Sequence, residues 1–167
     1  GAGDQGCRAD PILHRGGPGV IRFRHATRDD VPTILAMLVD DSLGATRETD
    51  DLDLYFAAFD HIGAEPNTDL IVGEQDGRII ATYQISYLSG LSLKEARRAQ
   101  VESVLVAAYL RGQGVGAVLM AYAEARARVA GCSLIQLTTN KTRADAHRFY
   151  ERLGFTPSHI GFKRNLS

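Results

Sequence analysis

Hydrophobic and polar residues alternate along this chain with two different periods, which predict strands and helices in a mixed order. Residues 20–24 alternate with a period of two, as is typical of a half-buried strand. Apolar residues recur three or four positions apart within residues 31–38 and 52–59. This spacing predicts two amphipathic helices, which end near Gly44 and Gly63.

A β-hairpin is predicted after these helices. Apolar runs at residues 70–72 and 79–87 flank Asp76-Gly77, a dipeptide that favours tight turns between antiparallel strands. A loop then leads to another strand at residues 100–106. The middle of the chain is therefore expected to supply most of a sheet.

The second half of the chain continues with alternating helices and strands. A helix opens with the glycine-rich residues 112–116, and a strand is predicted at residues 134–138. The last helix has its apolar stripe within residues 146–153, and short strands around Phe155 and at residues 160–163 follow it. The order β-α-α-β-β-β-α-β-α-β-β predicts a mixed α/β domain around one central sheet.

Two of the predicted helices begin with a capping-box pattern, in which a threonine precedes an acidic residue by three positions. Thr27 with Asp30 and Thr142 with Asp145 fit this pattern at the first and last helices. Because such side chains satisfy the free backbone N–H groups of a helix start, we expect both pairs to act as caps.

Residues 1–18 differ from the rest of the chain because they carry many glycines and no hydrophobic period. The sequence begins with glycine rather than methionine, so we interpret residues 1–18 as a flexible N-terminal arm or a tag remnant. Residues 19–167 fit one domain, since domains usually have roughly 100–200 residues.

Charge and cysteine content narrow the class of protein. Lys and Arg number 19 and Asp and Glu 20, so no overall positive field would attract nucleic acid or an anionic membrane. No apolar run approaches the ~18 residues that span a membrane, so we expect neither a membrane span nor a signal peptide. Cys7 and Cys132 are too few for a disulfide framework and lack zinc-site spacing. We therefore expect a cytoplasmic protein, and the sequence assigns no metal ligands.

The most informative motif is the glycine-rich run from Arg111 to Gly116, between a predicted strand and a helix. A helix start has free N–H groups and a partial positive charge, so it binds anions readily. Glycines let a phosphate approach the backbone, and Arg111 adds a cation. A tight turn would explain one glycine, but three glycines in five positions favour a phosphate site.

A dinucleotide site is a second interpretation of this motif. The residue types at Gly112, Gly114 and Ala117 match the dinucleotide-binding pattern Gly-x-Gly-x-x-Gly/Ala. That fingerprint needs an acidic residue at the end of the next strand to hold the ribose, whereas residues 137–140 carry no carboxylate. A dinucleotide-binding oxidoreductase is therefore a weaker alternative.

Three motifs in order resemble the GNAT superfamily of acyl-CoA-dependent N-acetyltransferases. The family's signature Gln/Arg-x-x-Gly-x-Gly/Ala is met within residues 111–116, and residues 101–106 match its fourth strand. Residues 146–155, which follow Asn140, match its last-helix signature. The resemblance implies acetyl-CoA as cosubstrate. It also implies a twisted, mostly antiparallel sheet with a parallel pair splayed at the coenzyme site, flanked by about four helices.

The resemblance further implies how coenzyme A is held. Backbone amides of the glycine-rich run would bind the pyrophosphate, and the preceding strand would pair with the pantetheine like an added strand. Asn140 would bond near the pantetheine, and Tyr150 would lie beside the sulfur. The implied coenzyme-binding residues are Val104, Leu105, Val106, Arg111, Gly112, Gln113, Gly114, Val115, Gly116, Asn140 and Tyr150.

Two residues are candidates for catalysis. Tyr150 lies on an apolar stripe, so it is either a core tyrosine or the acid that protonates the leaving thiolate, as the resemblance implies. Glu102 is a carboxylate on a predicted central strand, where burial would favour a general base. Its structural alternative is an ion pair with Arg97 or Arg98.

Two other reactive side chains are interpreted as structural. His147 is expected on the exposed flank of the last helix, and Cys132 at a strand start is expected to be an inert core residue. Neither is expected to take part in catalysis.

The acceptor is less well defined. We expect it between the first two helices, the hairpin and the loop at residues 88–99. A small-molecule amine and a peptide amine both fit the family. Acidic residues before the second helix either attract such an amine or favour the helix start. They are Glu48, Asp50, Asp51 and Asp53.

Within the superfamily, residues 139–150 with Ser158-His159 and Phe162 are similar to aminoalkylphosphonate N-acetyltransferases. Glu102 departs from the glutamine expected there, and the sequence assigns no cations to a phosphonate.

The expected reaction is direct attack of the amine on the thioester in a ternary complex. A non-catalytic acyl-CoA sensor or interaction module is the main alternative. Homodimers are common in this superfamily, and the sequence locates no interface.

Overall fold

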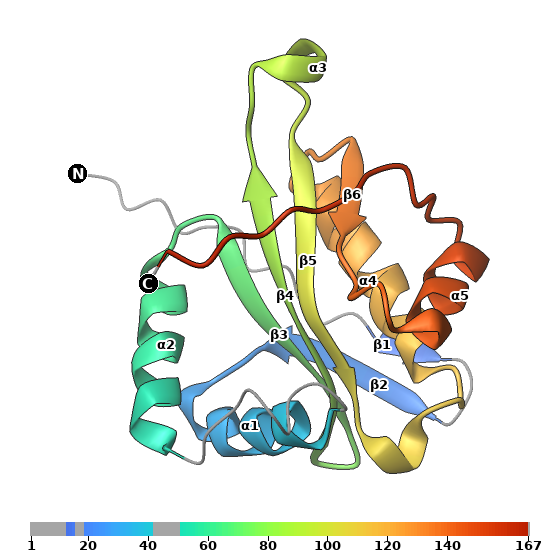
Figure 1. The fold of residues 1–167 in the computed structure, drawn as a ribbon. Coiled ribbons are helices and arrows are strands. Elements are labelled where there is room, and N and C mark those ends of the chain that lie inside the picture. The colour runs from blue at the N-terminus through green and yellow to red at the C-terminus, as the bar shows by residue number, and fades with distance from the viewer. Residues whose placement is uncertain (1–12, 16–18, 42–50, 167) are drawn as a thin grey trace.

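The computed structural model describes residues 13–15, 19–41 and 51–166. Its centre is a six-stranded sheet in which the strands lie in chain order (Figure 1). Every neighbouring pair is antiparallel except the last, β5 with β6, which is parallel. The strands are β1 (Leu13–Arg15), β2 (Val20–His25), β3 (Thr68–Gln75), β4 (Arg78–Leu88), β5 (Arg98–Val106) and β6 (Leu134–Leu137).

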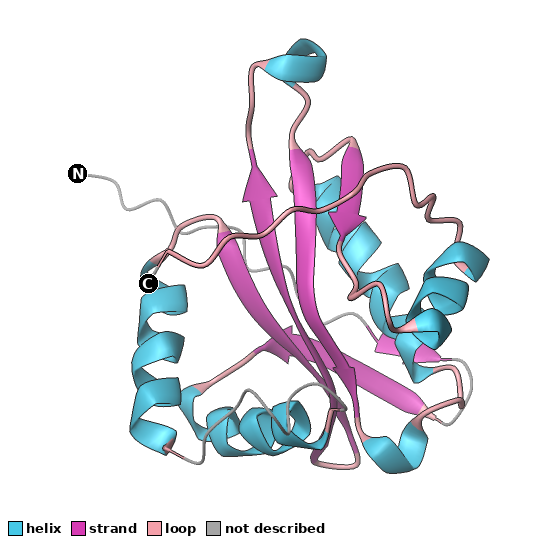
Figure 2. Cartoon of the chain, in the orientation of Figure 1, coloured by secondary structure: helices cyan, strands magenta, loops and turns pink. Residues whose placement is uncertain are grey.

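Helices cover both faces of this sheet (Figure 2). Tyr83 and Ile85 of β4 pack into the core that α4 completes, whereas Thr82 and Gln84 line a cavity beneath α1 and α2. Because successive side chains of a strand point to opposite faces, α4 lies on one face and α1 and α2 on the other. The helices are α1 (Val31–Asp40), α2 (Leu52–Ala64), α3 (Ser92–Glu95), α4 (Val115–Val129) and α5 (Ala144–Arg152), with short 3-10 turns η1 (Arg28–Asp30) and η3 (Ala108–Leu110).

The hydrophobic core lies between the sheet and α4. Phe23 of β2 and Tyr122 of α4 stack with ring centroids 4.5 Å apart, and Ile21, Tyr83 and Leu119 are fully buried beside them. Aromatic and β-branched side chains on the strands thus meet the apolar stripe of α4. This packing holds the start of α4, and with it the glycine-rich loop, against the sheet.

A β-bulge interrupts β5 where it pairs with β4. Gln84 is opposite Glu102, but Thr82 is opposite Leu105, so β5 carries one residue more than β4 in this interval. Ser103 has a left-handed φ of 51° at this point. The extra residue reverses which side chains face each side of the sheet, so Ser103 and Leu105 both line the cavity beneath α1 and α2.

Only one of the two predicted capping boxes forms. The Asp30 carboxylate accepts the Thr27 N–H at 2.7 Å, as expected. Thr142 instead donates its N–H and its hydroxyl to Asn140 Oδ1, at 3.0 and 2.8 Å. Asp145 pairs with Arg148, so the prediction of a Thr142–Asp145 cap is wrong.

Helix and strand bounds also differ at several ends. The first helix ends at Asp40, and Gly44 lies outside the described residues. Three residues of the expected arm, Leu13–Arg15, pair with β2 as strand β1. No strand forms within residues 155–166, so the two short strands predicted after the last helix are wrong for the described chain. Among the described helices, none combines the length and apolar character that a bilayer crossing requires.

Candidate active site

The glycine-rich loop turns into α4 through two left-handed glycines. Gly112 and Gly114 have φ values of 75° and 86°, a region that L side chains adopt only with strain. The first helical hydrogen bond runs from the Val118 N–H to the Gly114 carbonyl at 3.2 Å. The N–H groups before Val118 therefore lie outside the helical ladder and point out of the helix start.

We expect all backbone amides of the loop to be free to bind a ligand, but two of them are not. The Arg111 N–H donates to the Ala108 carbonyl and the Gln113 N–H to the Leu110 carbonyl, both at 3.3 Å. Within the described residues, the other four amides that are expected to bind the pyrophosphate make no backbone hydrogen bond. They belong to Gly112, Gly114, Val115 and Gly116. An anion at this helix start would therefore be held chiefly by these four groups.

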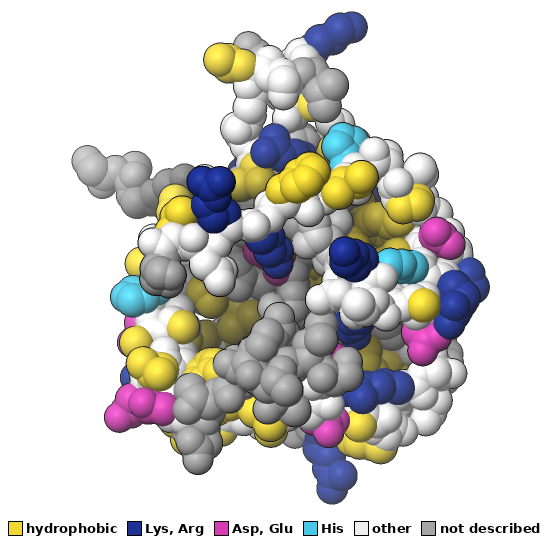
Figure 3. All heavy atoms as spheres, viewed as in Figure 1, with side chains coloured by type: hydrophobic (Ala, Val, Ile, Leu, Met, Phe, Trp, Pro, Cys, Tyr) yellow, Lys and Arg dark blue, Asp and Glu magenta, His cyan; other side chains and the backbone are white. Residues whose placement is uncertain are grey.

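The Arg111 side chain bridges the loop to neighbouring elements. Its Nε donates to the Val106 carbonyl at 3.3 Å, and its Nη2 lies 3.5 Å from Asp40 Oδ2 at the end of α1. About half of each side chain in this ion pair is exposed, so the guanidinium still faces solvent. Lys and Arg side chains gather on this face of the molecule around its central hollow (Figure 3). The surroundings suit a ligand that carries phosphates.

The parallel strands β5 and β6 separate beside this loop. Their pairing ends at Val101 and Leu137, whereas β5 continues to Val106. Leu105 and Val106 pair with β4 on one side only, so in the described chain the opposite edge of residues 102–106 carries no strand. An extended, amide-bearing ligand fits such an edge, because it can pair with the backbone as a strand would.

Asn140 lies in the turn between β6 and α5. Its Oδ1 accepts both hydrogen bonds from Thr142, and its backbone carbonyl lies 3.1 Å from His147 Nε2. The side-chain oxygen is therefore committed to the turn. The expected contact with pantetheine would have to come from Nδ2.

Tyr150 packs on the inner side of α5. Its ring makes edge contacts with Phe149 and Phe155 at centroid distances of 5.0 and 5.7 Å. Burial raises the pKa of the Tyr150 hydroxyl, and the nearby Arg143 guanidinium lowers it by less. The phenol is therefore protonated at neutral pH, which is the state that a proton donor needs.

Glu102 is exposed, so the expectation that it is buried is wrong. Glu102 is opposite Gln84, on the cavity side of the sheet, and the bulge brings the next residue, Ser103, to that side as well. Among the described side chains Glu102 forms no ion pair with Arg97 or Arg98. Arg97 donates instead to the Ala130 carbonyl at 3.1 Å. The alternative interpretation of Glu102, an ion pair with one of these arginines, therefore does not hold for the described side chains.

A small cavity lies next to Glu102, between the sheet and the first two helices. Its volume is about 110 Å³. Gln84, which is opposite Glu102, and Ser103 both contribute polar groups to a lining that is otherwise mostly apolar. Sequence reasoning missed these two residues. Gln84 reaches the cavity through the regular alternation of β4, whereas Ser103 reaches it through the bulge of β5. The remaining lining residues are Val31, Ile34, Leu35, Leu38, Tyr55, Ala58, Phe59, Ile62, Leu70, Thr82 and Leu105.

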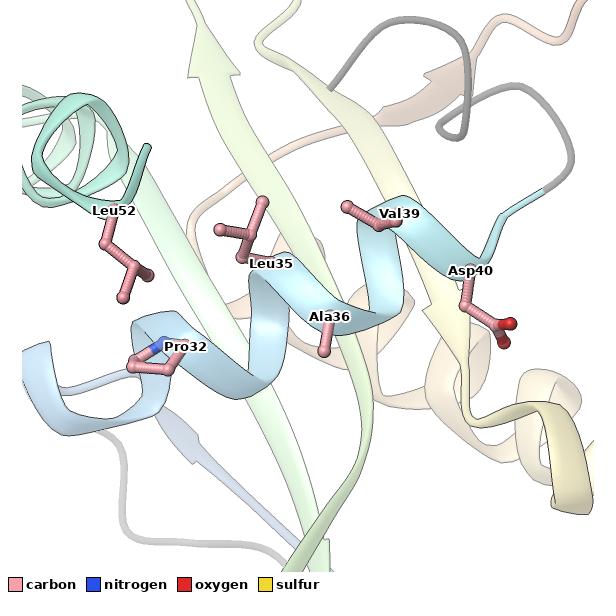
Figure 4. A pocket seen from close by; sticks show the side chains of 6 residues that line it. All are labelled: Pro32, Leu35, Ala36, Val39, Asp40 and Leu52. Atoms are coloured by element: carbon pink, nitrogen blue, oxygen red, sulfur yellow. The ribbon is translucent and has the colours of Figure 1, made fainter. Parts of the chain in front are cut away.

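A second hollow, of about 540 Å³, is an open groove along the outer side of α1 (Figure 4). Its lining is apolar except for Asp40, the partner of Arg111. Residues 42–50, which join α1 to α2, lie outside the described part of the chain. The groove therefore has no polar side chains comparable to Gln84 and Ser103 of the smaller cavity.

The other candidate side chains have structural surroundings. Cys132 is half-buried against the core, and burial raises the pKa of its thiol, which opposes a reactive thiolate. His147 is half-buried beside the Asn140 carbonyl rather than fully exposed. Asp51 caps α2 by accepting the Asp53 N–H at 3.1 Å, which favours the helix-start interpretation for these two residues. Glu48 and Asp50 lie outside the described residues.

Comparisons with known proteins agree with this architecture. An aminoalkylphosphonate N-acetyltransferase of Salmonella typhimurium is 31% identical over 148 residues, which cover 88% of this chain and 92% of that protein. A Bacillus halodurans protein described as a transcriptional regulator is 40% identical, with a TM-score of 0.83 over 87% of this chain and 99% of the other.

A glucosamine-6-phosphate N-acetyltransferase from Arabidopsis thaliana shares the fold, at 18% identity and a TM-score of 0.72 over 88% of this chain and 99% of that one. The family described as acetyltransferase (GNAT) matches residues 34–155, which is most of the described domain. The splayed parallel strands and the glycine-rich helix start both lie within the matched residues. The chain belongs to the GNAT family of acetyltransferases.

Proposed function

We propose that this protein transfers an acetyl group from acetyl-CoA to the primary amine of a small molecule, by direct attack in a ternary complex. One arrangement carries the proposal. The strand edge left open between β5 and β6 has the free amides of the α4 start on one side, and the bulge of β5 leads to the small cavity on the other. A thioester lying along the edge would meet an amine from the cavity at residues 102–105.

In this proposal Glu102 accepts the proton of the incoming ammonium, directly or through water. The neutral amine attacks the thioester carbonyl carbon, so a C–N bond forms while the C–S bond breaks. Backbone N–H groups of residues 104–106 stabilise the negative charge that develops on the carbonyl oxygen. Tyr150 gives its proton to the leaving thiolate. The protonated state of Tyr150 supports its role as the acid, and the position of Glu102 opposite the cavity residue Gln84 supports its role as the base.

The size and lining of the cavity support a small acceptor. A volume of about 110 Å³ accommodates a short aliphatic amine rather than a folded peptide. The relative named for aminoalkylphosphonates makes such compounds the first acceptors to test. Because the cavity is lined without Lys or Arg, a phosphonate group would lie at its mouth, near the basic side chains of this face.

The test is thiol release from acetyl-CoA with a panel of amines, followed with Ellman's reagent. The panel contains aminoalkylphosphonates, the matching aminoalkanes without phosphonate, polyamines, aminoglycosides and short peptides. We expect turnover with short primary amines and none with peptides. Faster turnover with the phosphonates than with the matching aminoalkanes would assign the anion a role. Turnover confined to peptides would contradict the small acceptor.

A non-catalytic acyl-CoA sensor is the second candidate, because the Bacillus halodurans relative is described as a transcriptional regulator. Calorimetry with coenzyme A separates the two functions. Tight binding without turnover of any amine would favour the sensor. Thermal protection by NAD but not by coenzyme A would instead favour the dinucleotide alternative.

A further inference from the structure

We propose that Asp40, at the end of α1, competes with the diphosphate of coenzyme A for Arg111, so that this ion pair limits the affinity of the enzyme for its coenzyme. The competition rests on the proposed function, in which the glycine-rich loop binds the diphosphate. Two ion pairs carry it, and both join the end of α1 to elements that surround the loop.

The side chain of Arg111 is held by two contacts of different kinds. Its Nε donates to the Val106 carbonyl at 3.3 Å, whereas its Nη2 lies 3.5 Å from Asp40 Oδ2. The backbone contact keeps the guanidinium beside the loop whether or not Asp40 is charged. The contact with Asp40 instead places a negative charge on the group that is to bind a phosphate. Arg111 therefore does not need Asp40 in order to reach the coenzyme.

The end of α1 carries two carboxylates at a place where a helix disfavours them. Asp40 is the last residue of α1 (Figure 4), and Asp41 is its C-cap. Backbone carbonyls give this end of a helix a partial negative charge, so acidic side chains there are destabilising. The last turn of α1 holds no basic residue that would offset them. Helix stability therefore does not explain these carboxylates, whereas their pairing with arginines from distant parts of the chain does.

Asp41 fixes the position of Asp40. The Oδ1 atom of Asp41 lies 3.4 Å from Nη2 of Arg143, which is the N-cap of α5, and only 12% of the Asp41 side chain is exposed. The helix itself is anchored by the buried side chains of its first half. The neighbouring residue Asp40 is thereby kept beside Arg111, and the coenzyme meets a carboxylate that is already in place.

The charges decide the direction of the effect. A diphosphate carries more negative charge than one carboxylate, and like charges at neighbouring positions repel each other. Asp40 thus lowers the affinity for an anion at the loop, both by neutralising Arg111 and by direct repulsion. The free amides at the start of α4 also attract the diphosphate, so the coenzyme can replace Asp40 at Arg111.

Calorimetry with coenzyme A tests this competition. We expect Asp40→Asn to lower the dissociation constant about 3- to 10-fold at low ionic strength, because it removes the charge and keeps the shape of the side chain. Asp40→Glu keeps the charge and should bind coenzyme A as wild type does. The matched control is Asp60→Asn, since the Arg28–Asp60 ion pair joins η1 to α2 and its side chains are 55% and 59% exposed, close to the 49% and 59% of Arg111 and Asp40.

Two further ligands and a second background locate the effect. Dephospho-coenzyme A keeps the diphosphate, so Asp40→Asn should bind it more tightly by the same factor. Pantetheine carries no phosphate, and its affinity should be unchanged. In an Arg111→Gln background, Asp40→Asn should give a much smaller gain, because the group for which Asp40 competes is absent.

Several results would overturn the competition and leave the proposed function intact. They are an unchanged or weaker affinity of Asp40→Asn for coenzyme A, an equal gain in Asp40→Glu or Asp60→Asn, and an undiminished gain in the Arg111→Gln background. A gain that is absent with dephospho-coenzyme A, or equal with pantetheine, would overturn it as well. Failure of the wild-type protein to bind coenzyme A would instead overturn the coenzyme site, and the competition with it.

Discussion

Gly116 of α4 lies against the ring of Phe149 of α5, because a Cβ atom on Gly116 would stand only 3.0 Å from Cζ of Phe149. Tyr150 follows Phe149 directly, and the two rings are in edge contact. The absence of a side chain at Gly116 therefore lets α5 approach the phosphate loop. One contact couples the proposed coenzyme site to the proposed proton donor.

Gly116→Ala is expected to disturb both sites. The added methyl group would push the Phe149 ring away, at a cost of about 1–3 kcal/mol in the free energy of unfolding. Displacement of α5 should also lower kcat by moving Tyr150. Urea titration and steady-state kinetics measure the two effects. The control is Gly63→Ala in α2, where a Cβ would meet nothing within 4 Å and stability should rise by roughly 0.5–1 kcal/mol. If Gly116→Ala has the stability and the kcat of wild type, α5 can move without consequence for either.

Tyr150→Phe should lower kcat about 100-fold or more and leave coenzyme A affinity nearly unchanged, because it removes the proton donor but keeps the ring. Kinetics and calorimetry give the two quantities. Tyr109→Phe is the matched control, since the Tyr109 ring is 63% exposed and packs at no proposed reacting group. Equal kcat values for wild type and Tyr150→Phe would remove Tyr150 from the reaction.

Glu102→Gln should reduce kcat/KM for the amine by about 100-fold or more, because an amide cannot accept the ammonium proton. Coenzyme A binding should be unaffected. Glu124→Gln, on a half-exposed residue of α4 paired with Arg128, serves as the control and should be as active as wild type. If Glu102→Gln retains full activity at every pH, the base is another group or water.

Acid should destabilise the fold through Asp69. Burial raises the pKa of this carboxyl group, but hydrogen bonds from His25 and Arg126 outweigh burial and lower the pKa to about 2. Since the folded pKa lies below the unfolded value, the stabilisation is present above about pH 4 and is lost as the pH falls toward 2. It amounts to roughly 2 kcal/mol.

Urea titrations of Asp69→Asn at pH 7 and pH 2 check this expectation. The variant should be less stable than wild type at pH 7 and about equally stable at pH 2. Asp60→Asn is the control, because the Arg28–Asp60 ion pair is more than half exposed and should contribute less than about 1 kcal/mol. A difference for Asp69→Asn that persists at pH 2 would assign the loss to packing rather than to charge.

Local patterns were sufficient to predict most elements. Apolar spacing gave the first two helices and the long α4, Asp76-Gly77 gave the hairpin between β3 and β4, and the glycine-rich run gave the helix start. These features depend on residues close together in sequence, so periodicity and turn chemistry reveal them. The capping box at Thr27 and Asp30 formed for the same reason.

Other features depend on contacts between distant residues. The Thr142 cap failed because the side chain of Asn140 took both Thr142 donors. The place of Ser103 at the cavity follows from one extra residue in β5, which the spacing of apolar positions does not reveal. A register between two strands is set by their mutual packing rather than by either sequence alone.

The sequence by itself determined the family, the helix start that suits a phosphate and the residue types available for acid–base chemistry. Each of these depends on a short run of neighbouring residues. Only the tertiary structure decided which amides of the loop remain free and that Gly116 admits the ring of Phe149. It also decided that β6 is the last strand of the sheet, with no strand of the described chain on its outer edge. These properties are relations between surfaces far apart in sequence, so they exist only once the chain has folded.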